Sequence, residues 1–323
     1  MEYIKIKDMK QDQKTSTVVL LTAIEEKETK GGSPYCRLTL CDGETQIQAN
    51  LWNKTKADVK VPEKTLITVE LYPKLYQEAL SYEVFRYGPA PEDCAITDYI
   101  VKAPYDSQSM YDNILAVLRK EIPDHEQDLI CMVEKLYEDH KEKLLYWSAA
   151  KSVHHNCYGG LLYHTFRMIR SGIALSRVYH IDKELLLAGI ALHDVGKIYE
   201  LETDNLGAAE YSIDGVLFGH AMLGIELINK EVGRAQMLGT PYDKEKVRLL
   251  KHMLCAHHGN LDWGAITVPV IPEAMMLHEI DMIDSRIYQF EQVMKDLEPG
   301  SISDKIFSLG SRVYKPLEED KDE

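Results

Sequence analysis

The chain has 323 residues, is 45% apolar and carries a formal net charge of −15, so it is long enough for two domains and too apolar for wholesale disorder. No apolar run reaches the roughly 18–20 residues that span a bilayer, and the charged N-terminus lacks the apolar centre of a signal peptide. The six cysteines form no CxxC pair, which is typical of reduced thiols, so we expect a cytoplasmic protein with no membrane partner.

The charge is unevenly distributed along the chain. Residues 1–95 hold 13 Lys and Arg against 15 Asp and Glu, whereas the remainder holds 24 against 37. A strongly acidic balance argues against a nucleic-acid binder. The N-terminal third is nearly neutral, however, and can present a basic face locally.

Residues 14–90 alternate between apolar and polar positions and are rich in β-branched and aromatic residues. Turn signals such as "KGGSP" and "CDGE" separate the runs. Leu38 and Leu40 precede a turn at Asp42-Gly43, and the alternation resumes at Ile47, as a hairpin requires. About five short strands predict a small β-barrel of the OB type over residues 1–90.

A barrel of this type binds single-stranded nucleic acid by stacking bases on aromatic side chains beside a basic groove. Trp52 and Tyr76 are candidate stacking residues, with Lys54 and Lys56 as candidate phosphate contacts. The alternative is that most of the barrel's aromatic residues fill its core or its edge. We expect Trp52, beside Asn53 and Lys54, to face the ligand.

The period becomes helical after the Pro-rich stretch at 87–95. A helical connector is expected over 91–144, with one helix at 107–122 capped by Ser107 or Ser109, and more helix at 125–147. Residues 145–310 are expected to be entirely helical, and 311–323 form an acidic tail. The expected helical segments of this region are 159–179, 182–201 with Asp182 as its cap, 219–233, 243–259, and 272–297 with Pro272 in its first turn.

Histidine and aspartate residues recur at apolar faces and helix ends of this region, where an unpaired polar side chain is costly. Three lie inside expected helices, one as a single histidine and two as a histidine–aspartate pair, and the others fall at helix ends or in the last helix. They are His164, His193, Asp194, His220, His257, His258 and Asp281. Convergence on a metal would satisfy all of them together.

Imidazole and carboxylate ligands suit divalent ions such as Mn²⁺, Fe²⁺ and Zn²⁺. Two such ions bridged by a carboxylate can hold the attacking and the leaving oxygen of a phosphoryl group. The ordered series His…HisAsp…His…HisHis…Asp in an all-helical region therefore indicates a phosphohydrolase site more strongly than a single HD dipeptide does.

The series "YHT…ALHDVGK…GH…CAHHG…EAMMLHEID" resembles the HD superfamily of metal-dependent phosphohydrolases. Over most of residues 15–290 the chain is similar to the YhaM-type 3′→5′ exoribonucleases, which join an N-terminal OB-fold to an HD domain. Stretches such as "RLTLCDGETQIQANLWN" and "CAHHGNLDWG" carry this resemblance. It implies a multidomain α and β protein in which a five-stranded OB-type barrel precedes an all-α HD domain.

The resemblance also implies residue roles. His164, His193, Asp194 and Asp281 would hold a first ion, and Asp194 would bridge to a second ion held by His220 and His257, with His258 substituting or assisting. Lys197 would contact the substrate phosphate, although the residue alone reads as a solvated lysine. Arg286 would contact nucleic acid, where a lysine is common in the family, and His155 would line the pocket. Asp284 and His278 are expected to support the ligands.

The implied cofactor is a pair of divalent ions, Mn²⁺ foremost, with Fe²⁺, Zn²⁺, Mg²⁺ or Co²⁺ as alternatives. The implied reaction is hydrolysis of single-stranded RNA, and of single-stranded DNA as an extension, from the 3′ end to nucleoside 5′-monophosphates by a metal-activated hydroxide. Two alternatives stay open: hydrolysis of a small or cyclic nucleotide, and a binding protein with an inactive site. A homo-oligomer is also expected. Tyr163 departs from the family, which usually has glutamate directly before the first histidine.

Overall fold

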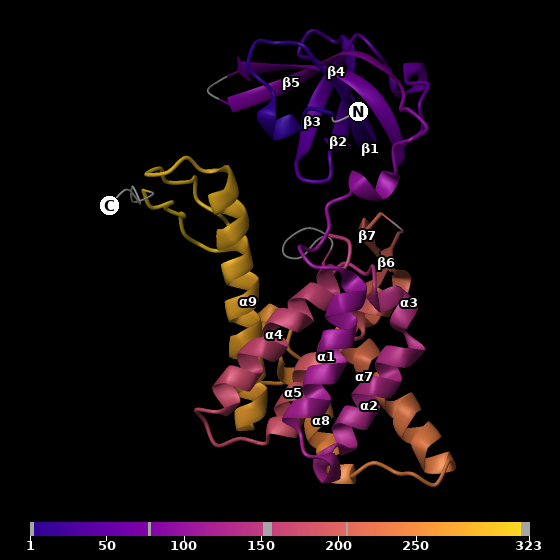
Figure 1. The fold of residues 1–323 in the computed structure, drawn as a ribbon, viewed down its shortest axis with the longest axis vertical. Helices are drawn as coiled ribbons and strands as arrows, with labels where there is room; N and C mark the ends of the chain where they lie inside the picture. The colour runs from indigo at the N-terminus through magenta and orange to yellow at the C-terminus, as the bar shows by residue number, and fades with distance from the viewer. Residues whose placement is uncertain (1–2, 77–78, 151–156, 205, 318–323) are drawn as a thin grey trace. The chain divides into compact units, whose positions relative to one another are not determined.

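The structure is a computed structural model that describes residues 3–76, 79–150, 157–204 and 206–317. The chain divides into two compact units, Met1–Lys102 and Ala103–Glu323. Figure 1 shows the two units, one built of strands and the other mostly of helices. Within the described residues, no helix combines the length and apolarity needed to cross a membrane.

The first unit is a closed barrel of five strands. They are β1 (Thr15–Glu28), β2 (Pro34–Cys41), β3 (Gln46–Trp52), β4 (Thr65–Tyr76) and β5 (Ala79–Pro89). Their order around the barrel is β1-β2-β3-β5-β4, with β4 paired to β1. Only the β3–β5 pair is parallel among these described strands. This is the OB-type barrel that the sequence predicts.

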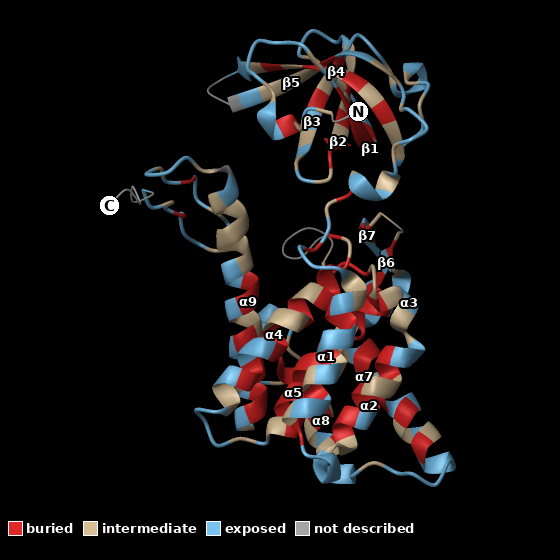
Figure 2. Cartoon of the chain, in the orientation of Figure 1, coloured by how far each residue is buried: buried red, intermediate tan, exposed pale blue. Residues whose placement is uncertain are grey.

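Alternate residues of the barrel strands form its core, since successive side chains of a strand point to opposite faces. Leu38 and Leu40 of β2 are buried, as are Val69 and Leu71 of β4. Figure 2 shows this alternation as red segments between tan and blue ones along the strands. The period-2 pattern read from the sequence is therefore confirmed.

The second unit is mostly helical. Its elements are α1 (Ser107–Glu121), α2 (Asp128–Asp139), α3 (Lys141–Leu144), α4 (Gly160–Ser176), α5 (Lys183–Leu192), α6 (Lys197–Glu200), β6 (Leu201–Thr203), β7 (Ala209–Tyr211), α7 (Ile213–Met237), α8 (Lys244–Ala256) and α9 (Pro272–Asp296). Helix α5 contacts α2, α4, α8 and α9 and is buried almost throughout (Figure 2). It is therefore the central helix of this unit.

Of the segment expected as a separate connector, residues 103–144 belong to this helical unit, where α1 packs on α4 and α2 packs on α5 and α7, and residues 91–102 belong to the first unit. Asp106, not Ser107 or Ser109, caps α1, and its carboxylate accepts a 2.8 Å hydrogen bond from the backbone N–H of Ser109. Asp182 caps α5 and Pro272 begins α9, as predicted.

Two parts of the expected all-helical region are not helical. Residues 201–203 and 209–211 form a small antiparallel hairpin, β6–β7. The described residues after α9 hold only isolated β-bridges, such as that between Ile302 and Tyr314. Strands of three residues carry too little alternation to be recognised from a sequence, so the prediction of continuous helix was wrong here.

Candidate metal centre

The His193–Asp194 pair lies in a turn, not inside a helix as the sequence suggested. Helix α5 ends at Leu192, and α6 begins only at Lys197. Gly196 makes the turn possible, because a Cβ atom there would lie 1.9 Å from the carbonyl oxygen of His220. The absent side chain therefore lets the turn lie directly against α7.

The first group of candidate ligands comes from three elements. His164 lies on α4, His193 follows α5, and Asp281 lies on α9. The Nε2 atoms of His164 and His193 are 3.3 Å apart, and Nε2 of His164 lies 3.4 Å from Oδ1 of Asp281. Both histidines are fully buried.

The second group contains His220, His257 and His258. His220 follows Gly219, whose φ of 69° separates α7 into two helical segments at this point. The Nε2 atoms of His220 and His257 are 3.1 Å apart, and the rings of His257 and His258 have their centroids 4.1 Å apart. His258 therefore belongs to the cluster, although the sequence left its role open.

Asp194 lies between the two groups. Its Oδ2 is 3.3 Å from Nε2 of His193 and 3.8 Å from Nε2 of His164, whereas its Oδ1 is 3.5 Å from Nε2 of His220. One carboxylate oxygen thus faces each group. This is the arrangement that a carboxylate bridging two ions requires.

The hydrogen bonds of the histidines test whether cations fit these groups. Nδ1 of His193 and Nδ1 of His257 each lie within 2.8 Å of a backbone carbonyl, of Ile190 and Leu254 respectively. A carbonyl only accepts, so both Nδ1 atoms must donate, and in the neutral rings both Nε2 atoms carry lone pairs. Each lone pair faces Nε2 of another histidine, so each of these pairs needs a positive group between its two nitrogens, either a proton or a metal ion that displaces it. The residues therefore fit a metal pair.

The electrostatics of the first group also favour positive charge. Burial lowers the pKa of His164, but hydrogen bonds with Asp281 and Asp284 outweigh it and raise that pKa to about 10. Burial would raise the pKa of Asp194, yet the charges of Lys197 and His193 hold it well below its usual range. These carboxylates are therefore ionised and ready to coordinate a cation.

Two carboxylates orient the histidines, Glu200, which the sequence did not mark, and Asp284, which it did. Oε1 of Glu200 accepts 2.9 Å and 3.0 Å hydrogen bonds from Nδ1 and the backbone N–H of His220. Oδ2 of Asp284 lies 2.8 Å from Nδ1 of His164, in the supporting role expected for it. Such contacts fix the ring orientation and raise the basicity of the ligating nitrogen.

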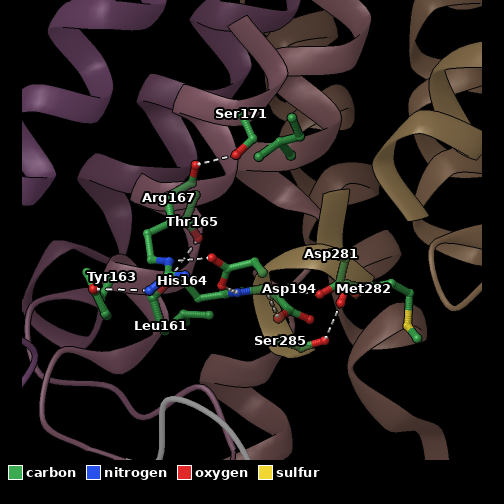
Figure 3. Close-up of polar contacts among 12 residues, drawn as sticks. Leu161, Tyr163, His164, Thr165, Arg167, Ser171, Asp194, Asp281, Met282 and Ser285 are labelled. Carbon is green, nitrogen blue, oxygen red and sulfur yellow. Dashed lines mark hydrogen bonds and ion pairs between the residues drawn. The ribbon is translucent and has the colours of Figure 1, made fainter. Parts of the chain in front are cut away.

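Arg167 holds Asp284 in place. Its Nε donates to Oδ1 of Asp284 at 2.5 Å, and its Nη1 donates to Glu291 at 2.7 Å and to the Tyr163 hydroxyl at 3.3 Å. Figure 3 shows Arg167 and Tyr163 beside His164. Tyr163, the residue directly before His164, therefore contacts the arginine that supports the first group.

Lys197 is buried, so its reading as a solvated lysine was wrong. Its Nζ lies 2.7 Å from Oδ2 of Asp194. A pocket of about 270 Å³ adjoins the two groups and is lined by Asp194, Lys197, His258, Trp263, His278, Asp281, Met282 and Ser285. Arg286 is exposed on α9, and His155 lies outside the described residues.

The candidate nucleic-acid residues of the barrel are exposed. Trp52, at the end of β3, is 40% exposed, and Tyr76, at the end of β4, is 62% exposed. The Trp52 indole donates a 2.8 Å hydrogen bond to Glu83 and packs on Tyr35. Lys54 and Lys56 are exposed as well. The barrel thus presents an aromatic side chain that is held in place yet open to solvent.

The chain is similar to known proteins over most of its length. The family described as HD domain matches residues 161–286. Three relatives are named 3′-5′ exoribonuclease YhaM. The one from Oceanobacillus iheyensis is 31% identical over 89% of both chains. The one from Bacillus subtilis is 29% identical over 90% of this chain and 92% of the relative, and the one from Shouchella clausii is 30% identical over 92% of both chains. The second OB-fold domain of replication protein A from Methanococcus maripaludis is 22% identical and covers 29% of this chain and 100% of its own, with a TM-score of 0.23, too low to support a conclusion.

Proposed function

Because the chain belongs to the YhaM family of 3′-5′ exoribonucleases, we propose that it hydrolyses single-stranded RNA from the 3′ end. The single observation that carries this proposal is the position of Asp194, with one carboxylate oxygen facing each group of histidines. A site for two divalent ions is suited to phosphodiester hydrolysis.

In the proposed reaction, water adds to the phosphorus of the last phosphodiester. The bond from phosphorus to the 3′ oxygen of the preceding nucleotide breaks, that oxygen takes a proton, and a nucleoside 5′-monophosphate leaves. When bound, the two ions would lower the pKa of the attacking water and offset charge on the phosphoryl oxygens. Imidazole and carboxylate donors suit divalent ions such as Mn²⁺, Fe²⁺ and Zn²⁺; we propose Mn²⁺, with Fe²⁺, Zn²⁺, Co²⁺ and Mg²⁺ as alternatives.

The chain's own residues prepare this centre. His164, His193 and Asp281 would hold one ion, and His220, His257 and His258 the other, with Asp194 between them. Lys197 lines the pocket with its ammonium group 2.7 Å from Asp194. It holds that carboxylate and presents positive charge toward a phosphate that enters the pocket.

The barrel would bind the RNA strand through Trp52 and Tyr76 beside Lys54 and Lys56, since base stacking and phosphate contacts together bind single strands without sequence preference. Single-stranded DNA offers the same features and is proposed as a second substrate. The six free thiols support a reducing, cytoplasmic environment. Assembly into a homo-oligomer stays a prediction, which light scattering of the purified protein tests.

The decisive experiment incubates the purified protein with Mn²⁺ and 5′-labelled single-stranded RNA. We expect a ladder that shortens from the 3′ end, with nucleoside 5′-monophosphates released. The Asp194→Asn variant should retain RNA binding and lose at least about a hundredfold in rate, since even a residue that only supports a ligand costs 10–100-fold. If the protein leaves RNA intact but hydrolyses a cyclic nucleotide offered under the same conditions, the small-nucleotide alternative is established. If it binds RNA but cleaves neither substrate, the inactive-site alternative is established.

A further inference from the structure

The pocket beside the candidate metal centre contains a large aromatic residue that the proposed chemistry does not use. Trp263 lines this pocket together with Asp194 and Asp281, yet its side chain is 56% exposed. It lies in the short 3-10 helix Leu261–Trp263, between α8 and α9. A single exposed aromatic residue needs no explanation by itself, but this one shares a pocket with the candidate metal ligands and with Lys197.

The loop that carries Trp263 is held firmly on both sides. At its start, Gly259 lies so close to α9 that a Cβ atom there would be 2.4 Å from the ring of His278. At its end, a Cβ atom on Gly264 would lie 3.4 Å from Nδ1 of His258, and the N–H of Ile266 donates to the carbonyl of Cys255 at 2.9 Å. The indole is therefore presented to solvent from a fixed backbone, with little entropy left to lose on binding.

Helix α9 connects the indole to Asp281, one of the candidate metal ligands. His278, Asp281, Met282 and Ser285 all line the pocket, and their spacing of i, i+3, i+4 and i+7 places them on one face of the helix. The ring of His278 lies 6.0 Å from that of Trp263, with the planes inclined by 33°. Thus the same pocket is lined by two carboxylates and Lys197 and also by an aromatic ring and the apolar Met282.

We infer that Trp263 is the platform on which the 3′-terminal nucleobase of the RNA stacks while its phosphodiester lies at the metal centre. The inference rests on the proposed exoribonuclease function and specifies how the last nucleotide is bound. A volume of about 270 Å³ is small for a ligand pocket and suits a single nucleotide unit. Every base has a π-face, so such a platform accepts all four bases and allows degradation without sequence preference.

The test compares two RNA substrates, one with an ordinary 3′-terminal nucleotide and one whose 3′-terminal nucleotide lacks its base. For the full-length wild type, loss of the base should lower kcat/KM for the first cleavage about tenfold or more, the range typical of one base–aromatic stack. Trp263→Ala should show a similar loss on ordinary RNA and little further loss on the abasic RNA. Trp263→Phe should recover most of the activity, and Leu261→Ala, a matched exposed position in the same turn, should cleave both substrates as the wild type does.

Equal slowing of both substrates by Trp263→Ala would overturn the inference, because the indole would then act on the loop or on His258 and not on a base. Unchanged kinetics on both would overturn it too. If the wild type degrades no RNA, the proposed function fails, and fluorescence still decides about the platform. The chain has three tryptophans, so Trp52→Phe leaves Trp263 and the buried Trp147. Adenosine 5′-monophosphate should quench the emission of Trp263 in this variant, and ribose 5-phosphate should not. Equal quenching by both compounds, or quenching by neither, would contradict stacking on Trp263.

Discussion

Glu200 is expected to control the second group of histidines although it touches no substrate. It is largely buried and accepts both the ring N–H and the backbone N–H of His220. Glu200→Gln removes the negative charge that makes His220 a strong ligand, so we expect metal affinity or activity to fall about 10–100-fold. Metal content after dialysis and kcat on RNA measure this. Glu202→Gln, an exposed neighbour, is the matched control, and equal metal retention by the two variants would contradict the role.

Metal affinity should also depend on pH through His164. Burial opposes its protonation, but hydrogen bonds with Asp281 and Asp284 raise its pKa to about 10 when no ion is bound. His164 then carries a proton at neutral pH that an ion must displace, so affinity increases with pH up to that pKa. Below this pKa, each decrease of one pH unit weakens metal binding by up to about tenfold through His164 alone. Calorimetric titrations with Mn²⁺ between about pH 6 and 8 should show that affinity is lower at the lower pH and that binding releases a proton. An affinity that does not change with pH would contradict this role of His164.

Single residues also show what the sequence could predict of the site. His164, His193 and Asp194 stood out because such side chains are costly at apolar positions, and the structure brings them together. Glu200 and Trp263 did not stand out, since an acidic residue at a helix end and an aromatic in a loop are common. Glu200 is significant because of His220, a neighbour more than fifteen residues away, and Trp263 because it is exposed beside a pocket. A single sequence reveals neither.

At the scale of the elements, the break between α5 and α6 creates the site. A continuous helix was expected, because no proline interrupts the apolar run and an isolated glycine such as Gly196 is a weak signal. The structure ends α5 at Leu192, and this places Asp194 between the two histidine groups. The apolar character of α5 was informative in another respect, since it correctly marked a buried helix.

Gly196→Ala tests the importance of this break. The added methyl would lie 1.9 Å from the carbonyl oxygen of His220 and 2.6 Å from the backbone nitrogen of Gly224, and backbone atoms cannot rotate away as side chains do. We expect the free energy of unfolding to fall by roughly 1–3 kcal/mol or more, as for other overpacked sites, with loss of the ion held by His220. Thermal unfolding and metal content measure both effects.

Gly233→Ala is the matched control for that substitution. Gly233 lies within α7 and has no heavy atom within 4 Å of the added methyl. Alanine there should leave activity unchanged and stabilise the helix by about 0.5–1 kcal/mol. If Gly196→Ala behaved like this control, the close approach of the turn to α7 would not be required for the site.

For the whole molecule, the division of charge agrees with the division into two units. The nearly neutral N-terminal third forms the barrel, and most of the net charge of −15 lies in the rest of the chain. Several of those acidic residues are paired within the helical unit, as Asp284 is with Arg167. A negative net charge is therefore compatible with RNA as substrate, provided that strand binding depends on local aromatic and basic side chains and on bound cations.

Trp52→Ala should separate strand binding from hydrolysis. The indole is 40% exposed and is held by Glu83 and Tyr35, so its loss should weaken binding of single-stranded RNA by about 1–3 kcal/mol, the usual value of one base stack. Fluorescence anisotropy with labelled RNA measures the affinity, and hydrolysis of a dinucleotide, which offers only the phosphodiester to be cleaved, should keep its kcat. Phe85→Leu is the matched control, because the Phe85 ring is already covered by the ammonium of Lys14, 3.5 Å from its centroid. Equal losses for the two variants would mean that apolar area in general, and not a prepared stacking face at Trp52, binds the strand.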